Sequence, residues 1–264
     1  MKKTVTFLLR IILYFIIIAP LLLFIAYGFS TRWFFPAPFP TEWTTSALDR
    51  ALNDPRMLMG MSEGLVIAIT VSLLSLLLAF PAARVMGLRQ FRGQQIAWLL
   101  LFLPTVVPPL AIGMGLNILF LQLGLAGTIP GVVLAHLAPT LPYTVFTLSS
   151  SFARYDENFE HQALALGASP LQIFFNVTLR LMMPSLIVAA LFAFLISWSQ
   201  YLLTLLIGGG KIITLPVLLF AAASGGDPST IGIRSLLFLL PPVLVIAFTA
   251  RELNRHGNAI REQY

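Results

Sequence analysis

Few side chains in this sequence have the types and spacing that chemistry requires. The three histidines, His136, His161 and His256, are far apart, and there is no cysteine, so neither a metal-ligand cluster nor a thiolate site is predicted. The run Gly208-Gly209-Gly210-Lys211 has residue types of a phosphate-binding loop but not the G-x-x-x-x-G-K-[ST] spacing. We interpret that run as a turn. The chain is therefore expected to be non-catalytic, to hold no cofactor and to hydrolyse no ATP by itself.

The composition is that of a protein embedded in lipid. Of the 264 residues, 58% are hydrophobic and only 10% are charged, whereas a soluble domain carries about 25% charged residues. The mean hydropathy is +0.91. The formal net charge of +6 is therefore interpreted as a marker of membrane topology, with lipid as the surrounding partner and no role in nucleic-acid binding.

Six apolar segments are long enough to cross a bilayer, which predicts an all-α polytopic membrane protein with one transmembrane domain over the whole chain. The segments are residues 1–28, 59–86, 96–121, 130–151, 183–207 and 231–250. The first has a longer apolar core than a signal peptide and no small-residue cleavage pair, which favours an uncleaved span. The third contains Pro104, Pro108 and Pro109, so it is expected to be buried in protein or to line a cavity.

The positive residues predict an orientation for these spans. Six spans leave both ends on one side, and the segments on that side carry most of the Lys and Arg, including Arg84 and Arg89. Such residues concentrate in cytoplasmic loops, so we predict an inner-membrane protein with both termini in the cytoplasm. Residues 29–57 and 208–230 are then external loops, the second with a short re-entrant or interfacial segment, and residues 152–184 are cytoplasmic.

Ionisable side chains are nearly absent from the centres of the predicted spans, where His136 is the exception. Buried ionisable groups are the usual mark of transporters driven by ion gradients, so their scarcity argues against that class. His136 has two interpretations, part of a proton path or a hydrogen-bonded packing residue, and packing is favoured. Energy for any transport would therefore have to come from a partner.

A solute path through the spans is expected to be lined by polar and aromatic side chains. The candidates are Asn117, Tyr143, Ser197, Gln200 and Tyr201. Small hydroxyl residues are also ordinary packing residues between membrane helices. Path and packing stay open as alternatives, with Gln200 and Tyr201 the strongest path candidates.

A long polar island separates the fourth and fifth predicted spans. Asp156 is expected to cap a helix whose one face carries Phe159, Ala163 and Leu166. Gly167 falls where a left-handed glycine would end that helix. The island therefore begins with a short helix that stops abruptly.

A second short helix is predicted beyond this corner. Ser169 and Pro170 have the pattern of an N-cap followed by proline at the first helical position, and Pro184 closes the segment. A simple turn needs only a few residues, so an ordered, angled helix pair of this size indicates a docking site. An amphipathic loop that lies on the membrane, or on its own chain, is the alternative.

The run HQALALGASP at residues 161–170 is followed by Val177, Leu179 and Pro184. This pattern resembles the EAA loop of ABC-importer permeases, which has the form E-A-A-x-x-L-G-A-S with a downstream V-x-L-P. His161 occupies the usual glutamate position, with Glu160 one residue earlier, and glutamine follows at the next alanine position. In addition, Arg180 stands where the family has the first proline of a pair.

The resemblance implies a six-helix permease that pairs with a copy of itself or a paralogue. Two cytoplasmic ATPase subunits and an external substrate-binding protein would complete the importer. In such a complex the loop enters a cleft of the ATPase, and closure of the ATPase dimer on ATP would switch the helices between inward-open and outward-open states. The residues implied to couple to the ATPase are Glu160, His161, Gln162, Ala163, Leu166, Gly167, Ala168, Ser169 and Pro170.

The loop and the segments ISWSQYLLT and GGGKIITLPVLLF are most similar to the branch that imports polyamines, ferric iron, sulfate, molybdate or thiamine. This implies import of a small solute such as spermidine or putrescine, with ferric iron, thiamine, sulfate and molybdate as alternatives. Two hypotheses of a different class stay open. A passive channel would use the proline-rich spans as a pore, and a membrane scaffold would recruit a cytoplasmic partner without transporting anything.

Overall fold

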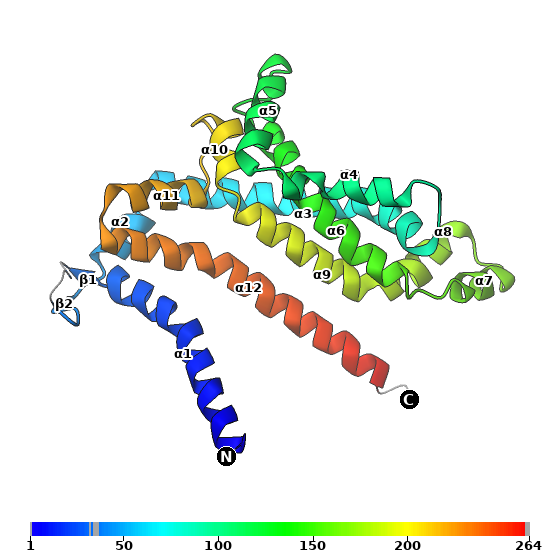
Figure 1. The fold of residues 1–264 in the computed structure, drawn as a ribbon, viewed down its shortest axis with the longest axis horizontal. Helices are drawn as coiled ribbons and strands as arrows, with labels where there is room; N and C mark the ends of the chain where they lie inside the picture. Colours follow the sequence, from blue (N-terminus) through cyan, green and yellow to red (C-terminus); the bar gives the residue numbers. More distant parts are fainter. Residues whose placement is uncertain (1, 32, 34–36, 262–264) are drawn as a thin grey trace. The chain divides into compact units, whose positions relative to one another are not determined.

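The computed structural model describes residues 2–31, 33 and 37–261, and the described chain is almost entirely helical (Figure 1). The protein divides into two compact units, one formed by Met1–Ser62 with Ile213–Val243 and the other by Glu63–Ile212 with Leu244–Tyr264. Of the predicted external loop 29–57, residues 32 and 34–36 lie outside the described residues.

Among the described residues, four helices are long and apolar enough to cross a membrane. They are α3 (Pro55–Leu88), α6 (Ile129–Phe152), the continuous helix Pro170–Trp198 and the Pro228–Arg255 part of α12 (Pro228–Arg261). The pair α4 (Gln94–Val106) and α5 (Pro109–Gln122) adds a fifth if it is counted as one bent span. Helix α1 (Lys2–Gly28) is apolar over Ile12–Gly28. An apolar helix or helix pair thus stands at each predicted span, and the all-α polytopic class is confirmed.

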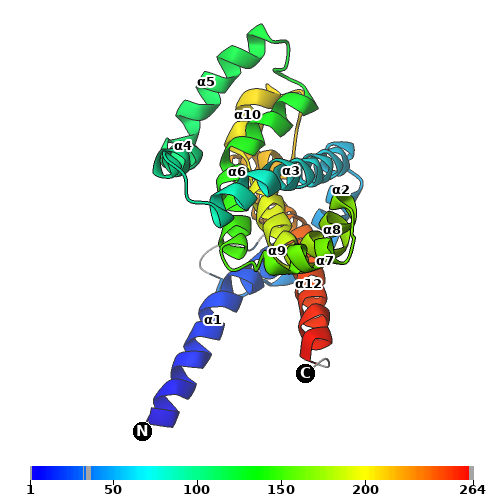
Figure 2. The ribbon, with the colours of Figure 1, turned by 90° about the vertical axis from the view of Figure 1, so that its right-hand side faces the viewer.

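The third predicted span is not the continuous helix that was expected over residues 96–121. Helices α4 and α5 meet at an angle of 98°, which Figure 2 shows. Val107 between them is extended, with φ −71° and ψ 135°, because the ring of Pro108 disfavours the helical conformation in the residue before it. Pro108 and Pro109 also lack the N–H groups that would continue the helix.

The fifth predicted span is also broken. Helix α9 (Leu179–Trp198) stops before residues 199–201, and α10 (Leu202–Gly208) begins after them. No proline or glycine occurs in this break. The expected turn after the span is present, with Gly209 and Gly210 at φ values of 55° and 76°.

The first unit contains the small elements β1 (Ser30–Thr31), β2 (Glu42–Trp43), α2 (Ser46–Leu52) and α11 (Leu215–Gly225). The two strands pair antiparallel. Helix α11 coincides with the predicted re-entrant or interfacial segment. Its Leu218 carbonyl accepts a 2.8 Å hydrogen bond from Arg234, whose guanidinium also lies 3.9 Å from the Asp54 carboxylate. These contacts join α11 to the beginnings of α12 and α3.

In the second unit, α6 and α9 run side by side (Figures 1 and 2). One of its buried clusters joins α3, α6 and α9 near the end of α6, and consists of Ala79, Ala83, Val145, Leu148, Phe152, Met182 and Ala189. The close approach of α3 to α6 depends on Gly87. A Cβ there would lie 2.5 Å from the Ser149 carbonyl oxygen and 2.6 Å from the Phe152 Cβ.

We predict that Gly87→Ala destabilises the protein by about 1–3 kcal/mol, because overpacking of this kind forces the backbone of α6 to shift. Thermal unfolding of the detergent-solubilised chain would measure the change. Gly115→Ala in α5 is the matched control, since a Cβ at Gly115 meets nothing within 4 Å. Equal unfolding temperatures for the two variants would contradict the prediction.

Candidate functional site

The polar island folds as two helices joined at a corner, and we call residues 156–184 the corner element. It comprises α7 (Asn158–Ala165), α8 (Pro170–Ile173), the π-helical turn η1 (Phe174–Thr178) and the start of α9. Gly167 lies in the corner with φ +87°, a conformation that only glycine adopts readily. The predicted glycine corner is therefore present.

Local capping fixes the second helix of the corner element. The Ser169 hydroxyl accepts the Gln172 N–H at 3.4 Å, and the Gln172 side chain accepts the Ser169 N–H at 2.8 Å. This capping box, with Pro170 in the first turn, confirms the predicted helix start. Asp156 accepts the Asn158 N–H at 3.0 Å, although the residue at the N-cap of α7 is Glu157.

The corner element exposes large apolar side chains. Leu166 is 88% exposed and Leu171 is 71% exposed, and we call the two together with Phe159, Leu164 and Phe175 the exposed apolar set. Most of the candidate coupling residues are exposed as well, namely His161, Gln162, Leu166, Gly167, Ser169 and Pro170, while Ala163 and Ala168 are half-buried. Exposed apolar side chains grouped on an ordered polar element are typical of a protein interaction site.

Glu160 differs from these residues because its carboxylate is held by its own chain. One oxygen accepts a hydrogen bond from Arg84 at 2.7 Å. The other accepts hydrogen bonds from the hydroxyls of Tyr155 at 2.8 Å and Thr178 at 2.7 Å. The Glu160 side chain is only 15% exposed. Arg84, Tyr155 and Thr178 were not among the predicted site residues, and no spacing in the sequence brings them together.

The surroundings of the Glu160 carboxylate shift the pKa values of two groups, Glu160 and Tyr155. Burial raises the pKa of the Glu160 carboxyl, whereas hydrogen bonds from Thr178, Arg84 and Tyr155 and the positive charge of the arginine lower it. Burial is the largest single effect, but the lowering effects together outweigh it, so this pKa lies below its ordinary value of 4.5. Burial raises the pKa of Tyr155 to about 12, and its contacts with Glu160 act in the same direction. Near neutral pH the glutamate is charged and the tyrosine retains its proton.

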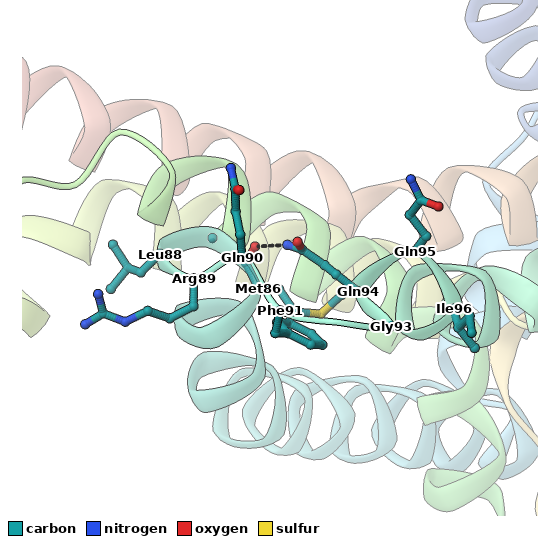
Figure 3. Close-up of a pocket in the computed structure, with 10 residues that line it drawn as sticks. Met86, Leu88, Arg89, Gln90, Phe91, Gly93, Gln94, Gln95 and Ile96 are labelled. Carbon is teal, nitrogen blue, oxygen red and sulfur yellow. Dashed lines mark hydrogen bonds between the residues drawn. The ribbon is translucent and has the colours of Figure 1, made fainter.

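A second ion pair connects the chain at the end of α3 to the corner element. Arg89 lies 2.7 Å from Glu157 at the start of α7. Arg89 lines a cavity of about 650 Å³ formed by residues 86–96. Figure 3 shows Gln94 turned back toward Met86, whose carbonyl accepts its 2.9 Å hydrogen bond, while Arg89 points the other way. The end of α3 and the turn after it therefore supply one arginine each to the corner element, Arg84 and Arg89.

Buried hydrogen bonds hold the break between α9 and α10. His136 on α6 is fully buried, with one ring nitrogen 2.9 Å from the Ser197 hydroxyl and the other 3.0 Å from the Thr204 hydroxyl. Thr204 donates to the Gln200 carbonyl at 2.9 Å, so its oxygen must accept from the histidine Nε2–H. The Nδ1 atom then accepts from Ser197. His136 thus joins both sides of the break, which supports the packing interpretation.

The predicted path residues are distributed over several elements. Ser197 is buried against His136 near the end of α9, and the half-buried Gln200 and Tyr201 lie in the break that follows. Asn117 is half-buried on α5, and Tyr143 is 44% exposed on α6. Among residues 2–31, 33 and 37–261 no cluster of three or more metal-ligating side chains occurs.

Comparison with known proteins identifies the relatives of this chain. The model of a family described as "Binding-protein-dependent transport system inner membrane component" matches residues 76–253. The chain is 29% identical over 244 residues to the putrescine transport system permease protein PotI of Escherichia coli (strain K12), covering 88% of this chain and 84% of that protein. It is 29% identical over 178 residues to the molybdate/tungstate transport system permease protein WtpB of Pyrococcus abyssi (strain GE5 / Orsay). That match covers 66% of this chain and 71% of WtpB.

A solved structure shares the fold. A chain of a bacterial ABC transporter involved in the import of the acidic polysaccharide alginate aligns with a TM-score of 0.74 over 95% of each chain. The two sequences are 17% identical, so this likeness shows the fold alone.

We predict that Glu160 adds stability that is present above pH about 4.5 and is lost as the pH falls through the depressed pKa of its carboxyl. Thermal unfolding should show a steeper loss of stability in acid for the native chain than for Glu160→Gln, which cannot lose a charge. Glu252→Gln, at the i,i+3 pair with the exposed Arg255 on α12, should follow the native chain. Parallel curves for the native chain and Glu160→Gln would refute this.

We also predict that His136→Ala lowers stability by about 1–3 kcal/mol, because Ser197 and Thr204 lose a buried hydrogen-bond partner. Ser199→Ala removes an exposed hydroxyl from the same break and is expected to change stability little. Denaturant titrations of the solubilised variants would test this, and an unaffected His136→Ala would show that the break is held by other contacts.

Proposed function

The chain belongs to the family of binding-protein-dependent transport system inner membrane components, and from this premise we propose how it works. It is a non-catalytic, multi-pass permease subunit of an ABC importer, in which a partner ATPase hydrolyses ATP. We propose that it forms the solute path together with a second permease, either a copy or a paralogue. Two ATPase subunits would bind its corner element, and an external binding protein would deliver the solute.

The observation that carries this proposal is the exposed apolar set on the corner element. Leu166, next to the glycine corner, is 88% exposed, although the element around it is capped, hydrogen-bonded and anchored by two ion pairs. Exposure of large apolar side chains to water is unfavourable. We therefore infer that a partner covers these side chains in the assembled protein. An ATPase works where ATP is available, so the corner element and both termini lie in the cytoplasm, and residues 29–57 and 208–230 lie outside.

The helix breaks suit a path that opens alternately to the two sides. The helices are interrupted at residues 107–108 and 199–201, which lipid does not permit unless protein or water satisfies the freed backbone groups. Such discontinuous helices therefore belong beside a cavity or a neighbouring chain. Gln200 and Tyr201, at the second break, are the side chains we place on the solute path, with Asn117 and Tyr143 further along it.

We propose that the solute is a small amine such as putrescine or spermidine. The relative that carries putrescine matches most of both chains. In addition, Trp98 and Phe102 on α4 lie 6.1 Å and 6.4 Å, between ring centroids, from Phe146 and Tyr143 on α6. Aromatic faces attract cations, and the two α6 rings are about half exposed.

The molybdate/tungstate relative makes an oxyanion the second candidate solute, and ferric iron, sulfate and thiamine are further alternatives. The test is to purify the chain from its native membrane with its partners and to measure which solute the accompanying binding protein retains. Putrescine or spermidine would support the proposal, whereas molybdate would replace it. Recovery of the chain without any ATPase would favour a passive channel or a scaffold.

We predict that Gly167→Val lowers ATP-driven uptake by on the order of tenfold while the chain still reaches the membrane. A valine at φ +87° is strained by at least about 1–2 kcal/mol, and relief of that strain would redirect α7 relative to α8. Uptake by reconstituted vesicles and the membrane content of the variant would be measured together. Gly226→Val, at φ +78° at the end of α11, is the matched control for strain alone, and unchanged uptake by Gly167→Val would contradict the coupling role.

A further inference from the structure

Glu160 connects α7 to three other elements of the second unit. Its donors are Arg84 near the end of α3, Tyr155 in the turn after α6, and Thr178 at the end of η1. We call these four residues the Glu160 cluster. Thr178 is completely buried and Arg84 is about one-third exposed. Hydrogen bonds to a carboxylate are short and strong compared with neutral ones, so the cluster is a firm connection within a polar surface element.

Thr178 is the last residue of the π-helical turn η1. The Leu179 N–H donates to the Phe174 carbonyl, five residues earlier, instead of four. One extra residue in a turn rotates the side chains that follow it, and such turns are frequent at functional sites. Helices α8 and α9 nevertheless run on through η1 as one continuous helix from Pro170 to Trp198. A force applied to Thr178 therefore acts directly on a membrane-spanning helix.

Aromatic packing supports the cluster from the side of the core. The Phe80 ring on α3 lies 5.3 Å from Phe152 and 5.7 Å from Phe174, between ring centroids, in both cases edge to face. Phe152 in turn lies 5.9 Å from Tyr155. These ring contacts pack the ends of α3 and α6 against the π-helical turn, next to the Glu160 cluster. A displacement of one of these elements would therefore displace the others.

Two connections consequently lead from α7 to α9. One is the chain itself, through the corner at Gly167, where the backbone turns sharply. The other is the hydrogen bond between Glu160 and Thr178, which bypasses that corner. The corner alone would let α7 tilt without moving α9, whereas the second connection opposes independent motion of the two helices.

We propose that Glu160 is a positioning residue that transmits displacement of α7 to α3 and α9, and that it acts through its own chain instead of touching the ATPase. This rests on the proposed function, in which the ATPase binds the exposed apolar set and moves α7. The contact between subunits then belongs to side chains such as Leu166. The pair Arg89–Glu157 is less suited to transmission, because the arginine is 63% exposed and the contact is single.

Paired substitutions at one buried position test the connection. Thr178→Val keeps the shape of the side chain and removes the hydroxyl, while Thr178→Ser keeps the hydroxyl. We expect Thr178→Val and Glu160→Gln to retain ATPase binding within about twofold of the native importer but to lose at least tenfold in the stimulation of ATP hydrolysis by the binding protein. Thr178→Ser should restore most of that stimulation. Thr147→Val, at a hydroxyl on α6 that donates only to its own helix, and Glu252→Gln are the matched controls.

A distance measurement separates transmission from a merely structural role. The chain has no cysteine, so spin labels at Asn158→Cys on α7 and Leu181→Cys on α9 would report the separation of the two helices in the assembled importer. In the otherwise native chain, ATP should leave this distance unchanged because the helices move together. In Thr178→Val and Glu160→Gln, ATP should change or broaden it.

Three results would count against the proposal or its premise. Normal stimulation in both Thr178→Val and Glu160→Gln, with an unchanged distance, would overturn the transmission role and leave the proposed function intact. Loss of ATPase binding in Glu160→Gln, with normal binding in Thr178→Val, would show that Glu160 touches the ATPase and would also overturn it. Failure of the unsubstituted chain to bind any ATPase would instead overturn the proposed function.

Discussion

The requirement that lipid imposes on backbone hydrogen bonds governs the second unit. A helix satisfies its own N–H and carbonyl groups, and every departure from helical conformation needs a partner inside the protein. At 199–201 that partner is partly a side chain, since Thr204 donates to the Gln200 carbonyl and is itself held by His136. One buried histidine thereby joins α9 and α10 across the break that interrupts the predicted fifth span. In the proposed importer such a break is informative, because irregular backbone beside lipid is retained where a path or an interface uses it.

The corner element divides two tasks between two kinds of side chain. Charged and hydroxyl groups point into the chain and fix the orientation of α7, as the donors around Glu160 show. Apolar groups such as Leu166 and Leu171 point outward and are available to a partner. This is the reverse of the usual arrangement in a soluble helix, where apolar groups face inward. An element built in this way resists rotation while it offers a hydrophobic surface, and both properties suit the proposed coupling to a partner protein.

Elements with local signals could be predicted from the sequence, and those that depend on distant partners could not. Ser169, Pro170 and Gly167 act on their immediate neighbours, so their spacing predicted the corner. Pro108 and Pro109 were recognised as unusual, but a continuous helix was still expected there, because spacing does not give the angle of a bend. The break at 199–201 had no local signal, since it is stabilised by His136 across more than sixty residues of sequence. The partners of Glu160 escaped prediction for the same reason: Arg84 belonged to a charge run that indicated only orientation.

The relatives of this chain support its role as a permease more strongly than they support any one solute. The family model matches residues 76–253, which include the corner element and the end of α3, so the proposed coupling role rests on a part of the chain that shares the family pattern. Relatives named for putrescine and for molybdate or tungstate are both 29% identical to this chain. A diamine and an oxyanion have opposite charge, so the permease scaffold of these relatives tolerates solutes of either sign. The scarcity of ionisable side chains in the predicted spans is consistent with that tolerance. In the proposed importer, discrimination between solutes would rest mainly on the external binding protein, and the proposed path residues Tyr143 and Gln200 would allow passage without tight binding.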